Sequence, residues 1–254
     1  MNKIEILKPG NNTAEIVLNR PAKHNAITPE MASAIRGARE ALDADKSVRC
    51  ILVRGAGERA FCAGTDLGTI AVYEDAWAWR HSVNYALEFG EFRKPVVAAL
   101  KGWVMGGGFE IALNCDIRVA STTAKFAAPE VKHGWLGAGG FSQRLTRLVG
   151  YGQASRILLT GSTIDAAEAY RIGLCEFLVE EGQEIATARN LSIEIAAHQE
   201  VATVTNKAGI RAAMEGGLTN GLAMERELMC LAFSLGAQRS GPAAFEQRER
   251  GQVR

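Results

Sequence analysis

The stretch from Lys94 to Glu130 limits the possible folds of this chain more than any other part of the sequence. It begins with the short, valine-containing apolar run 96–100, crosses three consecutive glycines at 106–108, and continues with apolar residues at helical spacing over 109–113. An apolar run this short that follows a proline is typical of a strand and not of a helix. The stretch therefore predicts a strand, a glycine turn and a helix in immediate succession.

The same stretch carries groups that can move protons beside a negatively charged oxygen. Glycine accepts positive φ and lets a ligand approach the bare backbone, and the start of a helix leaves N–H groups without intrahelical partners. Glu110 lies just beyond the glycines, and Glu130 follows a second expected strand at 116–120. Because amides can stabilise an enolate oxygen while carboxylates transfer protons, this arrangement predicts proton transfer next to a carbonyl.

A second turn of small residues precedes this stretch and completes a recognisable pattern. Residues 61–67 read Phe-Cys-Ala-Gly-Thr-Asp-Leu and follow the apolar run 50–53. Together with the later Gly-Gly-Gly-x-Glu and Pro-Glu, this motif resembles the crotonase (enoyl-CoA hydratase/isomerase) superfamily. Further matches lie at 18–27, 139–145 and 160–174, so the resemblance covers nearly the whole chain.

The resemblance implies an α/β fold, a crotonase-like spiral of repeated ββα units with two nearly perpendicular sheets and a C-terminal helical region. It implies a catalytic core over residues 1–200. Residues 201–254 would then cover the active site and build the contacts of a homotrimer or a dimer of trimers.

The resemblance also implies roles for individual residues. Glu110 and Glu130 match two glutamates that act on one water, with Glu110 assisting its attack at C3 and Glu130 handling the proton at C2. The backbone N–H groups of Thr65 and Gly107 match the two donors to the thioester oxygen. The remaining matches to positions that bind coenzyme A or substrate are Ala22, Lys23, His24, Ala63, Gly64, Asp66, Leu67, Gly106 and Trp135.

The presence of both glutamates favours hydration of a 2-enoyl-CoA, because relatives that only shift a double bond commonly keep just the later one. The alternatives are an enoyl-CoA isomerase, another acyl-CoA enolate reaction such as that of a lyase or decarboxylase, and a non-catalytic homologue that binds coenzyme A or RNA. No cofactor is expected beyond the coenzyme A of the substrate, and no metal. The lysine often found at position 22 in the family is alanine here, which leaves a contact between Lys23 and phosphate open.

Aromatic residues gather where the family borders the acyl chain. The cluster comprises Ile70, Tyr73, Trp77, Trp79, His81 and Tyr85, with Trp135 further along. It predicts either a bulky acyl pocket or, for Trp77 and Tyr85, ordinary packing in the core.

Composition excludes several other classes of protein. The net charge is +1 and 22% of the residues are charged, so no basic field indicates a nucleic acid or an anionic membrane surface as partner. No stretch approaches the roughly 18 apolar residues of a membrane span. The 5 cysteines are odd in number and widely spaced, and no apolar signal segment follows Met1, which favours a reduced, cytoplasmic setting. Gly137-Ala138-Gly139 could start a dinucleotide-binding motif, although no strand clearly precedes it.

Periodicity and turn signals order the remaining elements. They predict strands at 2–7, 13–18 and 49–54, a helix that starts at Pro29, and one helix over 75–90. Beyond Gly140 the pattern becomes helical, with six expected helices and one strand candidate at 175–179.

Overall fold

The computed structural model describes residues 3–72 and 75–236. The chain forms two compact units, Met1–Ala197 and His198–Arg254. Each unit is described by itself below.

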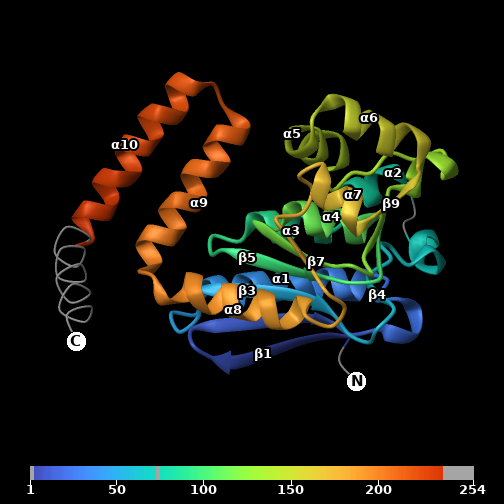
Figure 1. The fold of residues 1–254 in the computed structure, drawn as a ribbon, viewed down its shortest axis with the longest axis horizontal. Coiled ribbons are helices and arrows are strands. Elements are labelled where there is room, and N and C mark those ends of the chain that lie inside the picture. The colour runs from blue at the N-terminus through green and yellow to red at the C-terminus, as the bar shows by residue number, and fades with distance from the viewer. Residues whose placement is uncertain (1–2, 73–74, 237–254) are drawn as a thin grey trace. The chain divides into compact units, whose positions relative to one another are not determined.

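A six-stranded sheet runs through the first unit in the order β1-β2-β3-β5-β7-β10 (Figure 1). Strands β1 and β2 form an antiparallel hairpin, and every later neighbour pairs in parallel. The strands are β1 (Ile4–Gly10), β2 (Thr13–Leu18), β3 (Cys50–Gly55), β5 (Val96–Leu100), β7 (Ile117–Ser121) and β10 (Phe177–Val179).

Helices cover both faces of this sheet, which explains why its strands read as continuous apolar runs and not as alternating ones. Ile51 and Val53 point into the larger core, whereas Cys50 and Leu52 pack in a second cluster with Ala188. The helices concerned are α1 (Pro29–Ala44), α3 (Tyr85–Glu91) and α4 (Gly107–Asn114) on the larger core, and α8 (Glu184–Ala197) on the second cluster.

A second sheet of four very short strands has the order β4-β6-β8-β9. Its first three members are parallel, and β9 pairs with β8 in the antiparallel direction. Parallel strands end at the same edge of their sheet, so the residues that follow β4, β6 and β8 are brought together. The strands are β4 (Ala60–Cys62), β6 (Trp103–Met105), β8 (Lys125–Ala127) and β9 (Thr163–Asp165).

The helix expected over 75–90 is wrong as a single element. It is divided into α2 (Ala76–Arg80) and α3, and each begins at its own side-chain cap. Asp75 accepts a hydrogen bond from the N–H of Ala78, while Asn84 accepts from the N–H groups of Ala86 and Leu87. The two caps define separate helix starts, because a capping side chain satisfies N–H groups that only a first helical turn leaves open.

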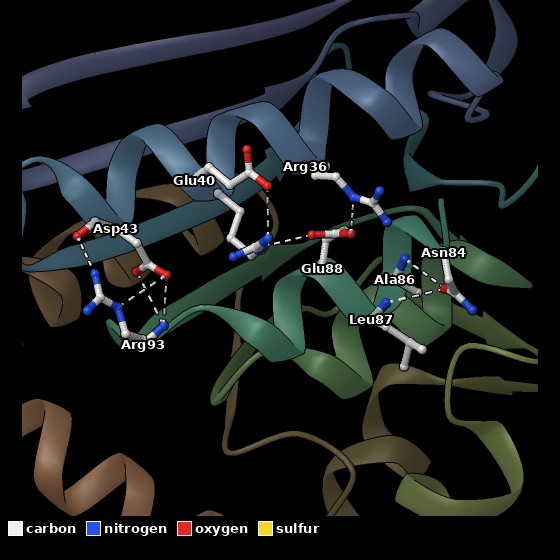
Figure 2. A network of polar contacts seen from close by, with 9 residues as sticks. Arg36, Glu40, Asp43, Asn84, Ala86, Leu87, Glu88 and Arg93 are labelled. Carbon is white, nitrogen blue, oxygen red and sulfur yellow. Dashed lines mark hydrogen bonds and ion pairs between the residues drawn. The ribbon is translucent and has the colours of Figure 1, made fainter. Parts of the chain in front are cut away.

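Helix α3 is fastened to α1 by charged side chains (Figure 2). Glu88 is buried on α3 and receives hydrogen bonds from Arg36 at 2.8 Å and Arg39 at 2.7 Å, both on α1. Beyond the end of α3, the backbone N–H of Arg93 donates to the carboxylate of Asp43. These contacts fix the position of α3, which carries Tyr85 as its first residue.

The first unit also contains several shorter helices. The 3-10 helices are Pro21–Lys23, Leu67–Val72 and Pro129–His133, and a π-helical turn at Phe141–Leu145 leads into α5 (Thr146–Val149). Helices α6 (Tyr151–Thr160) and α7 (Ala166–Arg171) follow. The second unit contains α9 (Glu200–Glu215) and α10 (Leu218–Ser234), which pack against each other. In the part of the chain that is described, no helix is both long and apolar enough to span a membrane.

Candidate active site

The predicted site residues follow three neighbouring strands of the small sheet. Thr65 comes shortly after β4, and Glu130 comes shortly after β8. Gly107 follows β6 after a single intervening residue, Gly106. Because these strands are parallel and adjacent, their carboxyl ends share one edge, which is where ligands of α/β proteins commonly bind. The small sheet therefore assembles residues that lie far apart in the sequence.

The two glycine-containing turns lie against each other so closely that neither tolerates a side chain. Gly64 has φ +91°, and a Cβ built on it would lie 2.8 Å from the backbone nitrogen of Gly107. Within the described residues, the N–H groups of Thr65 and Gly107 donate no hydrogen bond. Two neighbouring backbone donors without partners can stabilise an anionic oxygen placed between them.

Glu110 projects from the first turn of α4 into a nearly closed environment. Its side chain is 6% exposed, and its Oε1 accepts a hydrogen bond of 2.6 Å from the N–H of Gly139. The aromatic ring of Phe141 packs on Phe109 beside it, with ring centroids 5.2 Å apart. Burial raises the pKa of Glu110 to about 7, although the backbone donors of Gly139 and Phe141 partly oppose this rise.

Glu130 lies at the start of the 3-10 helix after β8, against the backbone of Gly106. A Cβ built on Gly106 would lie 2.9 Å from Oε1 of Glu130, and Gly106 also has φ +52°. The Oε2 atom of Glu130 is buried without a hydrogen-bond partner among the described residues. Burial raises the pKa of this carboxyl as well. A buried carboxylate oxygen without a partner is rare in proteins and indicates a group that meets its partner in a ligand or a water.

The carboxyls of Glu110 and Glu130 interact electrostatically. The negative charge of Glu130 contributes to the raised pKa of Glu110, after the larger effect of burial. Because the two groups interact, they lose their protons in separate steps, so over part of the pH range one carboxyl is ionised while the other is protonated. One carboxyl can then accept a proton while the other donates one.

The loop that the resemblance assigned to coenzyme A lies beside the turn at Thr65. The N–H of Ala63 donates to the carbonyl of His24 at 2.9 Å, and the N–H of Ile27 donates to that of Gly64 at 2.8 Å. Ala22 and Lys23 are exposed next to His24. The loop is held by the buried Asn25, whose amide donates to three carbonyl oxygens, those of Ala56, Ala60 and Phe61.

The other predicted binding residues lie around these turns. Asp66 forms an ion pair with Arg20 at 3.0 Å and also accepts from the N–H of Gly68, and the Arg20 contact lowers its pKa. Leu67 is exposed at the next position. Trp135 is 49% exposed, and its N–H donates to the carbonyl of Glu130 at 2.9 Å.

The aromatic cluster does not form one group. Trp77 is 70% exposed, so the expectation that it packs in the core is wrong. It stacks on His81 at the surface of α2, and Trp79 is exposed as well. Tyr73 and the side chain of Ile70 lie outside the described residues. Tyr85 is different, because its hydroxyl lies 2.7 Å from the side-chain oxygen of Thr65, at the predicted site.

Asn114 is a site residue that the sequence analysis missed. Its amide donates to the backbone carbonyl of Glu110 at 2.8 Å and to that of Gly139 at 2.6 Å. Since Gly139 donates to the carboxylate of Glu110, Asn114 fixes both the helix and the loop that hold this carboxylate. The available signal was an asparagine four residues after Glu110 in an otherwise apolar helix, where the two residues share one face.

The segment 137–139 does not fit a dinucleotide site. It follows the 3-10 helix Pro129–His133 and not a strand, and the N–H of Gly139 is occupied by Glu110. The strand, turn and helix that hold a pyrophosphate are therefore missing at this point of the described chain.

Similarity to known proteins extends over most of the chain. The model of the family described as enoyl-CoA hydratase/isomerase matches residues 8–252. The chain belongs to the enoyl-CoA hydratase/isomerase family. The resemblance to this superfamily and the expected α/β crotonase-like fold are both confirmed.

Individual members of the enoyl-CoA hydratase/isomerase family match over nearly their full length. A protein of Mycobacterium bovis named as a probable enoyl-CoA hydratase is 36% identical over 92% of this chain and 91% of its own. A short-chain-enoyl-CoA hydratase of Clostridium acetobutylicum is 34% identical over 98% and 97% of the two chains. Among solved structures, an enoyl-CoA hydratase from Bacillus anthracis superposes with a TM-score of 0.92 at 29% identity, covering 97% of each chain.

Proposed function

We propose that the protein catalyses the reversible syn addition of water to a 2-enoyl-CoA, which gives a 3-hydroxyacyl-CoA. The observation that carries this proposal is the pair of carboxyls with raised pKa values, the buried Glu110 and the partly buried Glu130, beside two backbone donors without partners among the described residues. An enzyme that only moves a double bond needs one group to carry a proton from one carbon to another. Hydration needs a base for the water and an acid for the carbon, and the pair supplies both.

The proposed reaction begins with the thioester oxygen between the N–H groups of Thr65 and Gly107. Glu110 accepts a proton from water while the water oxygen forms a bond to C3. The electron pair of the double bond moves toward the thioester oxygen, which becomes an enolate oxygen stabilised by the two amides. Removing one such donor typically raises the barrier by about 3 kcal/mol.

The enolate then collapses as C2 takes a proton from Glu130. The carboxyl pair has gained one proton from water and lost one to carbon, so its total charge is unchanged. Burial supports this exchange because it brings the pKa of Glu110 to about 7, where the group can accept and release a proton with little cost. The chemistry requires no cofactor beyond the coenzyme A that the substrate carries.

The remaining binding assignments are part of the same proposal. Ala22, Lys23, His24 and Ala63 would border the coenzyme A moiety, because their loop is hydrogen-bonded to the turn that precedes Thr65. Gly64, Gly106, Asp66, Leu67 and Trp135 lie on the segments around the two donors and Glu130.

We also infer a homotrimer or a dimer of trimers. Large apolar side chains are exposed on α9 and α10, including Ile210, Leu218 and Phe233. A surface of this kind is typical of a contact between subunits. A cytoplasmic location is supported by the five cysteines, which are all free thiols, four of them buried. Native mass spectrometry tests the assembly.

The test of the activity follows the absorbance of the conjugated enoyl thioester, with crotonyl-CoA and cinnamoyl-CoA measured in parallel. Loss of the band, together with a product one water heavier by mass spectrometry, supports hydration. The Glu110→Gln and Glu130→Gln variants should each lose activity, whereas Glu91→Gln, at an exposed position on α3, should not. A product of unchanged mass with a moved double bond would instead establish an isomerase.

A further inference from the structure

Tyr85 places a phenolic hydroxyl against both turns of the proposed oxyanion site. Its Oη lies 2.7 Å from the side-chain oxygen of Thr65. It also lies so close to the Cα of Gly107 that any side chain built at this glycine would overlap the hydroxyl. The hydroxyl is therefore next to the two residues whose backbone N–H groups would hold the thioester oxygen.

The hydroxyl of Tyr85 can donate a hydrogen bond to a ligand. Tyr85 and Thr65 each carry one O–H, and a single hydrogen bond between them uses only one of the two protons. When Thr65 donates, the proton of Tyr85 has no acceptor among the described residues, because Oη makes no other hydrogen bond there. Burial also raises the pKa of Tyr85 far above its usual range, so the phenol keeps its proton at any working pH.

The backbone around Tyr85 fixes the hydroxyl in this position. Tyr85 is the first residue of α3, directly after the capping residue Asn84. Figure 2 shows the side chain of Asn84 with its hydrogen bonds from Ala86 and Leu87. The side chain of Asn84 also donates to the carbonyl of Ala138 at 3.0 Å, next to the loop residue that holds Glu110. In the first turn of the same helix, Glu88 is bound by two arginines of α1. A donor on a well-anchored helix needs little reorganisation during a reaction, which is the condition for strong electrostatic stabilisation.

We propose that the hydroxyl of Tyr85 is a third hydrogen-bond donor to the thioester oxygen, beside the N–H groups of Thr65 and Gly107, and that the Thr65 side chain holds it in place. This inference rests on the proposed function, because the oxygen in question is that of an acyl-CoA thioester. It assigns a chemical role to the side chain at position 65, where backbone donation alone would allow any residue.

Two simpler roles for Tyr85 account for less of the geometry. A core residue that only fills space needs no hydroxyl. The ring of Tyr85 is half-buried, and a phenylalanine ring at this position would pack equally well. A wall of the acyl pocket would present the ring, whereas here the hydroxyl is the part that reaches Thr65 and Gly107. The difference between tyrosine and phenylalanine is therefore the decisive comparison.

The first test measures turnover of crotonyl-CoA by Tyr85→Phe, with Tyr151→Phe at an exposed position of α6 as matched control. Loss of a preorganised donor should lower kcat on the order of 10²-fold, as for other donors of this kind. Binding of butyryl-CoA, a saturated thioester without enolate charge, should change by no more than about threefold. A second pair of variants separates the side chain of Thr65 from its backbone, since Thr65→Val should lower kcat and Thr65→Ser should restore it.

The second test does not depend on hydration. Butyryl-CoA labelled with carbon-13 at the thioester carbonyl reports the polarisation of that carbonyl by its chemical shift when bound. The wild-type protein should move the signal downfield, and Tyr85→Phe should reduce this displacement while Tyr151→Phe leaves it unchanged.

The two tests distinguish failure of this proposal from failure of the proposed function. If the wild-type protein hydrates neither crotonyl-CoA nor cinnamoyl-CoA, the hydratase function is wrong, and a carbonyl signal that still differs between wild type and Tyr85→Phe supports the third donor. Identical bound carbonyl signals overturn the third donor, whatever reaction the protein catalyses. So does a kcat of Tyr85→Phe within about threefold of wild type.

Discussion

Replacing Glu110 by glutamine should make the folded protein more stable at neutral and alkaline pH. Burial raises the pKa of this carboxyl from its ordinary value of 4.5 to about 7. A group whose pKa is raised by folding stabilises the protein below the unfolded pKa, and this contribution is lost as the pH rises through the folded pKa. Ionised Glu110 therefore lowers the free energy of unfolding above pH 7, and a glutamine, which does not titrate, avoids this loss.

The magnitude follows from the pKa difference. A rise from 4.5 to about 7 corresponds to about 3 to 4 kcal/mol, at about 1.4 kcal/mol for each pH unit. Most of this, about 2.5 kcal/mol, should develop between pH 5 and pH 8. The measured quantity is the free energy of unfolding of Glu110→Gln minus that of the wild type. This difference should be larger at pH 8 than at pH 5 by this amount.

The assay is urea unfolding of both proteins at equal protein concentration over this pH range. Subtracting the wild-type free energy of unfolding from that of the variant cancels the pH dependence of all groups that titrate alike in both proteins. Glu91→Gln, at an exposed position of α3, serves as the matched control, and its difference from wild type should stay constant. A difference for Glu110→Gln that does not change with pH would refute the reasoning, because the buried carboxyl would then ionise at no cost to the fold.

Other predictions concern activity. Glu130→Gln should lower kcat by about 10²- to 10⁴-fold in steady-state hydration assays, with butyryl-CoA binding largely retained. The pH profile of kcat/KM should be bell-shaped, falling at acid pH, where both carboxyls are protonated, and at alkaline pH above the raised pKa of about 7, where both are ionised; a flat profile through pH 7 would contradict this. Gly64→Ala should abolish turnover, since its Cβ would lie 2.8 Å from the nitrogen of Gly107, and circular dichroism checks that the variant is folded. Asn114→Leu should lower kcat and move the upper limb of the profile, because Gly139 loses its anchor; an unchanged limb would exclude a positioning role.

The large sheet and most helices could be predicted from the sequence because their signals are local. The cap at Thr28 before Pro29 gives the start of α1, where its hydroxyl accepts from Met31, and the apolar run 96–100 is β5. The strands of the small sheet are only three residues long, too short to show any periodicity. Their existence depends on pairing between distant segments, which a single sequence does not display.

The residues of the candidate site also divide into those with a local sequence signal and those whose contacts depend on distant segments. The turns at Gly64 and Gly106 could be predicted, because a backbone that requires positive φ leaves glycine in the sequence. The contacts of Tyr85 with Thr65 and of Asn114 with Gly139 could not, since each depends on where a helix places its first or last turn relative to a loop from another part of the sequence. Trp77 shows the converse, because an aromatic residue at helical spacing proves to be exposed.

The order of the three parallel strands β4, β6 and β8 separates two tasks of the proposed reaction. The first two strand ends supply main-chain donors, which persist through almost any change of side chain. The third strand end and the first turn of α4 supply the carboxylates, which a single codon can remove or move. In the proposed reaction, a change of carboxylate would therefore alter the fate of the enolate, toward a shifted double bond or the loss of a carboxyl group as carbon dioxide, while the proposed main-chain donors to the enolate oxygen stay in place. The same separation makes the scaffold a practical starting point for laboratory selection of new reactions on acyl thioesters.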